Sequence, residues 1–224
     1  MKSKVNLCKK IDLQKPILID GVSGIGFIAE IVGTHIIKNL AAEKFGEINS
    51  PFFRDIAIST PDGSIQSPLL EFYYSRSEKL NDLIIILGNT QALISYGQYE
   101  LCSKILDVVQ SIGCQLVVSM EGLSKNIGTR ASKVYYTATD FETLDRLMKY
   151  GLNIFQGCIS GMSGLLMGLA KLRGMKGFCL LTETAGDYPD VPAARIILDR
   201  LNNILGLNIN LVNLEKAAEN IKGL

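Results

Sequence analysis

The stretch Pro-Ile-Leu-Ile-Asp-Gly-Val-Ser-Gly-Ile-Gly at residues 16–26 decides the fold. Its first five residues form a short, largely apolar run, which predicts a buried strand. Residues 21–26 then hold three glycines, which predict a tight turn. From residue 27 to residue 39, apolar side chains recur at the spacing of a helix. A strand, a turn and a helix in this order are the opening unit of an α/β fold.

The alternation of strand-like and helix-like segments continues along the chain. Short apolar runs predict further strands at residues 82–88, 114–119, 134–137, 152–155 and 177–182. Helical spacing predicts helices at residues 95–112, 141–149, 160–173 and 191–205, and a short one after Asn213. Asp140 and Asp190 are predicted to cap the helices that follow them. Segments 56–59 and 67–74, around a Pro-Asp-Gly-Ser turn, predict a β-hairpin.

These elements predict an α/β fold, a mostly parallel or mixed twisted sheet with helices on both faces. The chain has 224 residues, of which 47% are hydrophobic and 20% are charged. The mean hydropathy of +0.23 excludes a disordered protein. No linker, repeat or charge block interrupts the sequence, so we expect a single α/β domain over residues 1–224.

Charge and residue usage exclude several classes of function. The formal net charge of +1 lacks the electrostatic footprint of a protein that binds nucleic acid or an anionic membrane. Five widely spaced cysteines, without a CxxC pair, predict neither a disulfide framework nor a zinc site. His35 is the single histidine and lies in an apolar helical pattern, which favours a structural role. We therefore expect no metal and no cofactor, and a cytoplasmic location.

The glycine-rich stretch at residues 151–170 carries no charge. Its five glycines and several polar residues favour a strand, a turn and a core helix over a membrane span. Gly157, Gly161, Gly164 and Gly168 recur at near-helical spacing, which indicates close packing of this helix against the sheet or against another subunit.

Candidate functional residues lie where the predicted strands end. If the strands are parallel, their carboxyl ends meet at one edge of the sheet, where α/β proteins bind ligands. We expect one crevice there, for a ligand or a partner; ordinary turn chemistry is the alternative. Its predicted members are Gly21, Ser23, Gly24, Gly26, Asn89, Glu121, Glu183, Thr184, Gly186 and Asp187.

An enzyme could use this crevice. Ser23 and the amides of residues 24–26 would hold phosphate, and Glu183 or Asp187 would contact a ribose or a base, as in a nucleoside phosphorylase or hydrolase. The glycine spacing matches neither common nucleotide-binding motif. Arginine and histidine are scarce near these turns, although phosphate sites usually need a cation. A regulatory small-molecule binder on the same scaffold is a third hypothesis.

Three segments, in order, carry a family resemblance. They are Gly-Val-Ser-Gly-Ile-Gly at 21–26, Gly-Cys-Ile-Ser-Gly-Met-Ser-Gly at 157–164 with the helix after it, and residues 181–204. The last contains Glu-Thr, Gly-Asp and Pro-Ala-Ala elements and is the most specific. From about residue 16 to residue 221, the sequence resembles archaeal members of the proteasome assembly chaperone family, the group related to the second eukaryotic assembly chaperone.

The resemblance implies a fold similar to that of purine nucleoside phosphorylases, without catalytic activity. It also implies a homo-oligomer that binds proteasome α-subunits or assembled 20S particles. Some archaeal members dock through a C-terminal tail with a penultimate tyrosine. This chain has Gly223 at that position, so the resemblance does not extend to tail docking.

Overall fold

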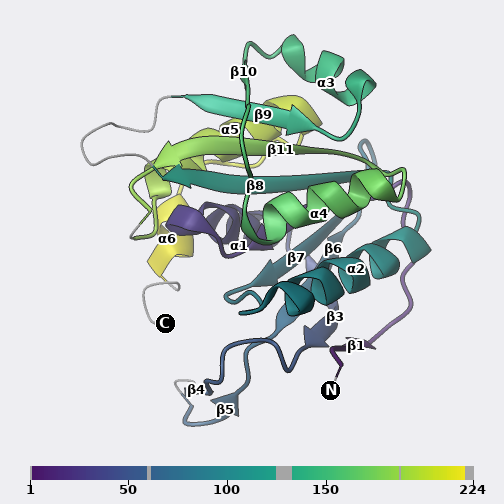
Figure 1. Ribbon diagram of the computed structural model, residues 1–224, viewed down its shortest axis with the longest axis vertical. Coiled ribbons are helices and arrows are strands. Elements are labelled where there is room, and N and C mark those ends of the chain that lie inside the picture. Colours follow the sequence, from purple (N-terminus) through teal and green to yellow (C-terminus); the bar gives the residue numbers. More distant parts are fainter. Residues whose placement is uncertain (1, 60–61, 125–132, 187, 220–224) are drawn as a thin grey trace.

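The computed structural model describes residues 2–59, 62–124, 133–186 and 188–219 (Figure 1). These residues form three layers, with a mixed sheet between two layers of helices. One face of the sheet is covered by α2 (Ser95–Ser111) and α4 (Gly161–Leu172). The other face is covered by α1 (Ile28–Asn39), α5 (Val191–Leu205) and α6 (Leu214–Glu219). The predicted fold class is confirmed.

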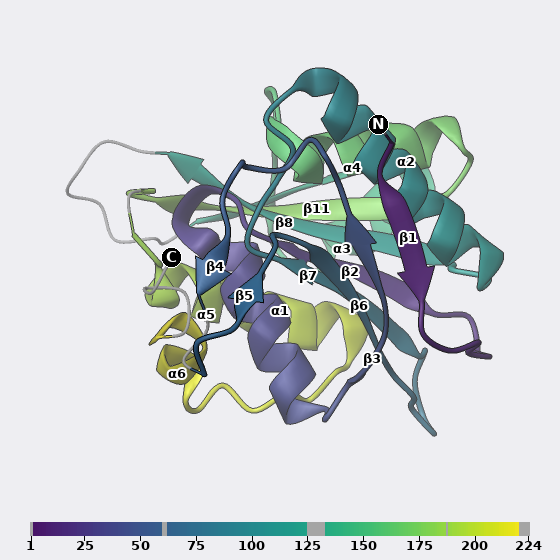
Figure 2. The same ribbon diagram turned by 90° about the horizontal axis from the view of Figure 1, so that it is seen from below.

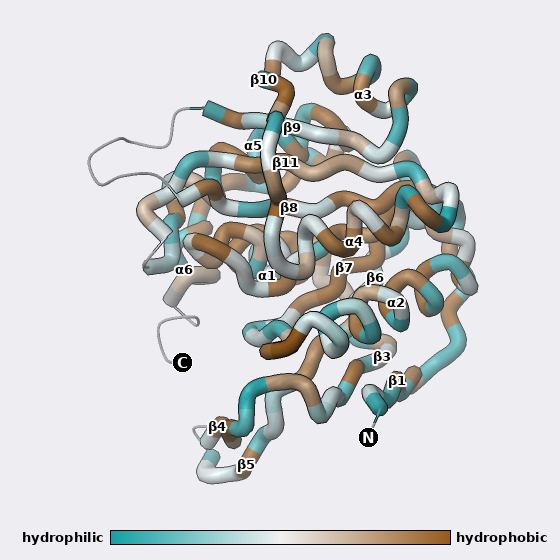
Figure 3. Tube along the Cα trace, viewed as in Figure 1, coloured by the Kyte–Doolittle hydropathy of each residue, from teal (hydrophilic) through white to brown (hydrophobic). Residues whose placement is uncertain are grey.

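Four parallel strands form the centre of the sheet. Their spatial order is β7 (Leu83–Gly88), β2 (Ile17–Val22), β8 (Leu116–Ser124) and β11 (Lys176–Thr184). All six residues of β2 are buried, because helices cover both faces of this strand. The brown centre of the sheet in Figure 3 shows the apolar character that this position requires.

Antiparallel strands flank this centre on both sides. Next to β7 lie β6 (Leu70–Ser75), β3 (Glu43–Asn49) and β1 (Lys4–Leu7), and Figure 2 shows β1 at the outer edge. Next to β11 lies the antiparallel β9 (Val134–Ala138), followed by the short β10 (Asn153–Ile154). The sheet of the described residues is therefore mixed, with a parallel centre.

The predicted hairpin of residues 56–59 and 67–74 is wrong in its pairing. The short β4 (Ile58–Ser59) pairs with β5 (Ile65–Gln66), and the two form a separate small sheet. Strand β6 instead joins the main sheet between β3 and β7. Alternate residues of β6 are buried, so one face of the strand packs on the core. A hairpin that projects from the molecule would leave these residues exposed.

Strands β1 and β3 were not predicted, because their sequences are polar. In β3, a β-bulge between Lys44 and Gly46 shifts the alternation, so Phe45 is buried although its neighbours are hydrophilic. The Lys44 ammonium lies 2.6 Å from the Glu71 carboxylate on β6 and 2.9 Å from that of Glu47. Charge pairing across the strands therefore replaces the apolar pattern that identifies a strand in a sequence.

Both predicted helix caps are present. The Asp140 carboxylate accepts a hydrogen bond of 2.9 Å from the amide of Thr143 at the start of α3 (Phe141–Met148). The Asp190 carboxylate accepts one of 3.0 Å from the amide of Ala193 in α5. Gly206, at φ 70°, ends α5 in the left-handed conformation that glycine adopts readily.

The central strands run further than their apolar cores indicate. Gly21 belongs to β2, Glu121 to β8, and Glu183 and Thr184 to β11, so the predicted ends of these strands, at residues 20, 119 and 182, are too early. Strands β8 and β11 pair without interruption from Leu116 and Lys176 to their ends. This ladder satisfies the backbone of the polar residues and keeps them extended.

Close packing of α1 against β2 depends on two glycines. A Cβ on Gly33 of α1 would lie 3.0 Å from the Cα of Gly21 on β2. The predicted glycine stripe of α4 is different: Gly164 has the Ile159 carbonyl oxygen where a Cβ would stand, but Gly168 faces open space. Among the described residues, another part of the backbone therefore approaches α4 closely at Gly164 but not at Gly168.

We expect Gly33→Val to lower the free energy of unfolding by about 2 kcal/mol or more, because the added atoms push α1 away from β2. Gly168→Val is the matched control on a helix, and its effect should stay within about 0.5 kcal/mol. Urea unfolding of both variants measures the difference. Equal stability of the two variants would contradict the packing described for Gly33.

Candidate functional site

The carboxyl edge of the parallel strands is organised around the Glu121 side chain. This carboxylate is 6% exposed and accepts hydrogen bonds from the backbone amides of Ile25, at 2.9 Å, and Gly122, at 3.0 Å. It also fills the space beside Gly24, where a Cβ would lie 2.6 Å from its Oε1 atom. The Glu121 carboxylate thus accepts the hydrogen bond that the Ile25 amide, in the turn after β2, could otherwise donate to a bound anion.

A second set of contacts holds this turn from the α5 side. Gly26, at φ 68°, lies against Thr184, whose hydroxyl donates a 2.7 Å hydrogen bond to the Asp190 carboxylate. The Asp190 amide donates to the Gly26 carbonyl at 2.9 Å, and the Gly186 amide donates to the Thr184 hydroxyl at 3.2 Å. Asp190 therefore links the end of β11 to the turn after β2, besides capping α5.

Gln91 connects three segments at the same edge, and sequence analysis did not select it. Its side-chain amide donates to the Ser23 carbonyl at 2.6 Å. Its side-chain oxygen accepts from the Met162 amide and from the Gln98 side chain, both at 3.0 Å. Gln91 follows β7 in the polar Asn-Thr-Gln segment, which was the available sequence signal.

The structure does not bring the predicted site residues into one crevice. Ser23, Gly24, Gly26, Glu121, Thr184 and Gly186 gather in the contacts just described, and Gly21 lies inside β2 against α1. Asn89 instead lines a separate cavity of about 190 Å³ beside β4 and β5. Asp187 lies outside the described residues.

Glu183 is separated from Thr184 by the strand itself, because successive side chains point to opposite faces of a sheet. It lines a hollow of about 460 Å³ with Leu123, Tyr135 and Phe155, and its carboxylate accepts a 3.2 Å hydrogen bond from the Tyr135 hydroxyl. The crevice predicted from topology is thus three separate places. Whether any of them contacts a ligand or partner stays a prediction.

Two further carboxyl groups are buried close to this edge. Burial raises the pKa of Asp20 to about 7, and the neighbouring Glu121 contributes in the same direction. Burial raises the pKa of Glu30 to about 7, although a hydrogen bond from Ser23 partly opposes this. Burial also raises the pKa of Glu121, against the effect of its two amide donors. One oxygen of Asp20 is buried without a hydrogen-bond partner.

His35 and the cysteines have structural surroundings. The His35 ring is buried, and its Nε2 lies 2.6 Å from the Asn210 carbonyl oxygen. All five cysteines are free thiols; Cys102 and Cys179 are buried, and burial raises the pKa of both. No group of three or more His, Cys, Asp or Glu side chains that could hold a metal ion occurs among the described residues.

Exposed apolar side chains gather at the start of α2. We call this set the α2 patch: Leu93, Ile94, Tyr96 and Tyr99, which are 52–65% exposed. Figure 3 shows the apolar stretch that leads into α2. The Tyr96 ring packs edge-on against Phe52 at 5.6 Å, so the patch has a defined shape. Contiguous exposed apolar residues of this kind commonly mark protein interaction surfaces.

Comparison with known proteins decides the family. The profile described as the PAC2 family matches residues 18–223. The chain belongs to the PAC2 family. Among curated relatives of this PAC2 protein, uncharacterized protein MJ1210 of Methanocaldococcus jannaschii is 32% identical, over 94% of this chain and 81% of that one.

Two solved structures from Pyrococcus furiosus share the fold. PbaB, described as an archaeal proteasome activator, has a TM-score of 0.87 and 31% identity, over 99% of this chain and 96% of PbaB. PbaA, described as an archaeal homolog of proteasome-assembly chaperone, has a TM-score of 0.81 and 28% identity, over 98% of this chain and 92% of PbaA. The family resemblance seen in the sequence is confirmed, and the family match agrees with the prediction that the chain is not an enzyme. A helix long and apolar enough to span a membrane does not occur in the described part of the chain.

Asp20 should make stability depend on pH. Because its pKa in the folded protein lies near 7, above the ordinary value of 3.8, the folded state holds more protons between these values. Stability should therefore fall as pH rises from about 4 to 7. Asp20→Asn should flatten this slope. At pH 8, its free energy of unfolding should be about 2 kcal/mol higher than that of the unaltered protein. Urea unfolding at several pH values tests this, and an unchanged slope would contradict it.

Glu121→Ala should lower the free energy of unfolding by about 2–4 kcal/mol, because two backbone amides, one buried and one partly buried, lose their acceptor. Glu121→Gln is the matched control: its side-chain oxygen can still accept from both amides, so it should lose less than half as much. Thermal and urea unfolding compare the two. Equal losses would show that the hydrogen bonds of Glu121 do not hold the turn.

Proposed function

We propose that this PAC2 protein is a non-catalytic, proteasome assembly chaperone-like protein of the cytoplasm. It acts as a single α/β domain in a homo-oligomer and binds proteasome α-subunits or 20S particles. The observation that carries this proposal is the similarity to PbaB and PbaA, which extends over almost the whole chain in both cases. This similarity supports the proposal because PbaB is described as a proteasome activator and PbaA as a homolog of proteasome-assembly chaperone.

In the nucleoside phosphorylase or hydrolase alternative, phosphate would have to compete with Glu121 at the predicted edge. The phosphate would need the amides of residues 24–26, and the carboxylate of Glu121 already accepts from the Ile25 amide. A bound phosphate would also lie beside that carboxylate, which repels it. A screen of nucleosides and phosphate esters should therefore show no turnover.

The α2 patch is the surface that we assign to self-association. Its two tyrosines and two aliphatic side chains match the composition of protein interfaces, which favour aromatic residues and avoid charge at their centre. The patch lies at the carboxyl edge of the sheet, where Gln91 ties the segment before it to β2 and α4. Self-association there would use a surface whose backbone is already held in place.

The first test is the oligomeric state. Ile94→Glu with Tyr96→Glu should convert the homo-oligomer to a smaller species in light scattering after size exclusion, because two charges would enter the interface. Phe141→Glu is the control, since this side chain is 83% exposed on α3, away from the patch. The proposed surface is wrong if both variants keep the size of the unaltered protein, or if both lose it.

The second test is binding to the proteasome. The protein, mixed with purified archaeal α-subunits or with 20S particles, should co-sediment with one of them at micromolar concentration. A cytosolic enzyme of unrelated fold and similar mass serves as the negative control. Absence of binding to both partners would overturn the proposed function. Gly223 lies outside the described part of the chain.

A further inference from the structure

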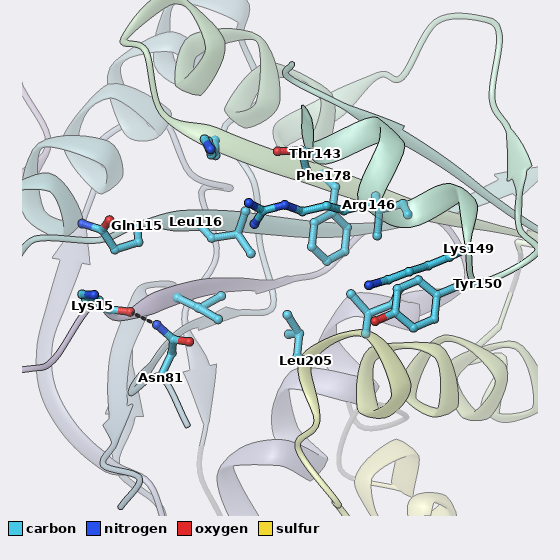
Figure 4. Close-up of a pocket in the computed structure, with 14 residues that line it drawn as sticks. Lys15, Asn81, Gln115, Leu116, Thr143, Arg146, Lys149, Tyr150, Phe178 and Leu205 are labelled. Carbon is cyan, nitrogen blue, oxygen red and sulfur yellow. Dashed lines mark hydrogen bonds between the residues drawn. The ribbon is translucent and has the colours of Figure 1, made fainter. Parts of the chain in front are cut away.

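A cavity of about 460 Å³ lies at the other edge of the sheet, at the amino ends of the parallel strands. Figure 4 shows its walls: the starts of β2, β8 and β11, the helix α3 and the end of α5. This edge is opposite the carboxyl edge, which holds the residues predicted from the sequence. The volume lies within the range of small-molecule sites, about 300–1,000 Å³.

Four cationic side chains line the cavity, and they come from three separate parts of the chain. Lys15 precedes β2, Arg146 and Lys149 belong to α3 and the residue after it, and Lys176 begins β11. None of the described residues that line the cavity is an aspartate or a glutamate. The chain as a whole is nearly neutral, so this gathering of positive charge is a local feature.

Acidic side chains outside the cavity offset part of this charge, and one of them, Asp140, interacts electrostatically with Lys176. Glu142 pairs with Arg146 and, at 2.6 Å, with Lys176. Lys15 and Lys149 form no ion pair with any described acidic residue. The Lys149 ammonium instead lies 5.5 Å from the centre of the Tyr150 ring. Two lysines at the cavity therefore keep their charge available for an anion.

The floor of the cavity is apolar and preformed. Phe178 is 2% exposed and Leu147 is 2% exposed, so their positions are fixed by the core. Leu116 and Leu205 complete the apolar wall, and Figure 4 shows the Phe178 ring between Arg146 and Leu205. A side-chain amide at the rim is also held in place, because Asn81 donates a 2.8 Å hydrogen bond to the Lys15 carbonyl.

We propose that this cavity binds a small organic anion: a phosphate or carboxylate group on a compact aromatic or apolar body. The anionic group would lie near Lys149, which Figure 4 shows on the same side of the cavity as Leu205 and Phe178, and the apolar body would lie against these two side chains. Lys15 would add positive potential from the opposite side of the cavity. Cations near the end of α3 also complement its helix dipole. That effect accounts for Lys149 but not for Lys15, which comes from another segment and faces the same space. The proposal is independent of proteasome binding.

Isothermal titration with 1-naphthyl phosphate tests the proposal, with 1-naphthoate as the carboxylate counterpart. At least one should bind with a dissociation constant below millimolar. Inorganic phosphate and uncharged 1-naphthol should bind at least about tenfold more weakly, because each lacks half of the recognised chemistry. Binding should weaken as salt rises, since the contact is partly electrostatic. Absence of binding by both aromatic anions would overturn the proposal.

Paired charge reversals locate the binding. Lys15→Glu with Lys149→Glu should weaken binding at least about tenfold. Lys38→Glu with Lys104→Glu makes the same change in net charge on α1 and α2, outside the cavity, and should leave binding within about twofold. Circular dichroism and thermal unfolding establish that both double variants fold. Equal effects of the two pairs, large or small, would show that the anion does not bind in this cavity.

Discussion

The buried carboxylate of Glu121 is the interaction on which the carboxyl edge of the sheet depends. It joins β8 to the turn after β2 through two backbone amides, and it requires Gly24 beside it because a Cβ there would lie 2.6 Å from one carboxylate oxygen. This turn determines where α1 begins, and α1 covers the centre of the sheet. A single side chain thus provides the negative charge that many α/β proteins obtain from a bound ligand.

This arrangement explains why an edge rich in polar residues need not be an active site. Asp20, Glu30 and Glu121 are buried, and burial raises the pKa of all three. Hydrogen bonds within the chain occupy the Ser23 and Ile25 amides and the Thr184 hydroxyl, which a ligand at this edge would otherwise use. The exposed apolar side chains of the α2 patch also lie at this edge, and they form a surface suited to another protein.

The sequence predicted the parallel centre of the sheet and its helices well, because continuous burial on both faces leaves an unambiguous apolar pattern at residues 17–22 and 83–88. It missed β3, where Lys44 pairs with Glu71 instead of burying an apolar side chain. The candidate site predicted from the sequence included residues from both faces of the sheet, because topology gives the edge on which a residue lies but not the face. Glu183 and Thr184, for example, are neighbours in sequence but lie on opposite faces. The cationic cavity could not be predicted from the sequence, because Lys15, Lys149 and Lys176 are far apart in the chain and only the fold brings them to one cavity.

The position of β11 has a consequence for how the protein is made. This strand lies between β8 and β9 in the sheet, although it follows both in the chain. During synthesis, β8 and β9 emerge from the ribosome with no partner on the edges that face each other in the finished sheet. Those edges can pair wrongly with other chains until Lys176–Thr184 arrives. A protein proposed to assist the assembly of others therefore cannot close the centre of its own sheet until β11 has been made.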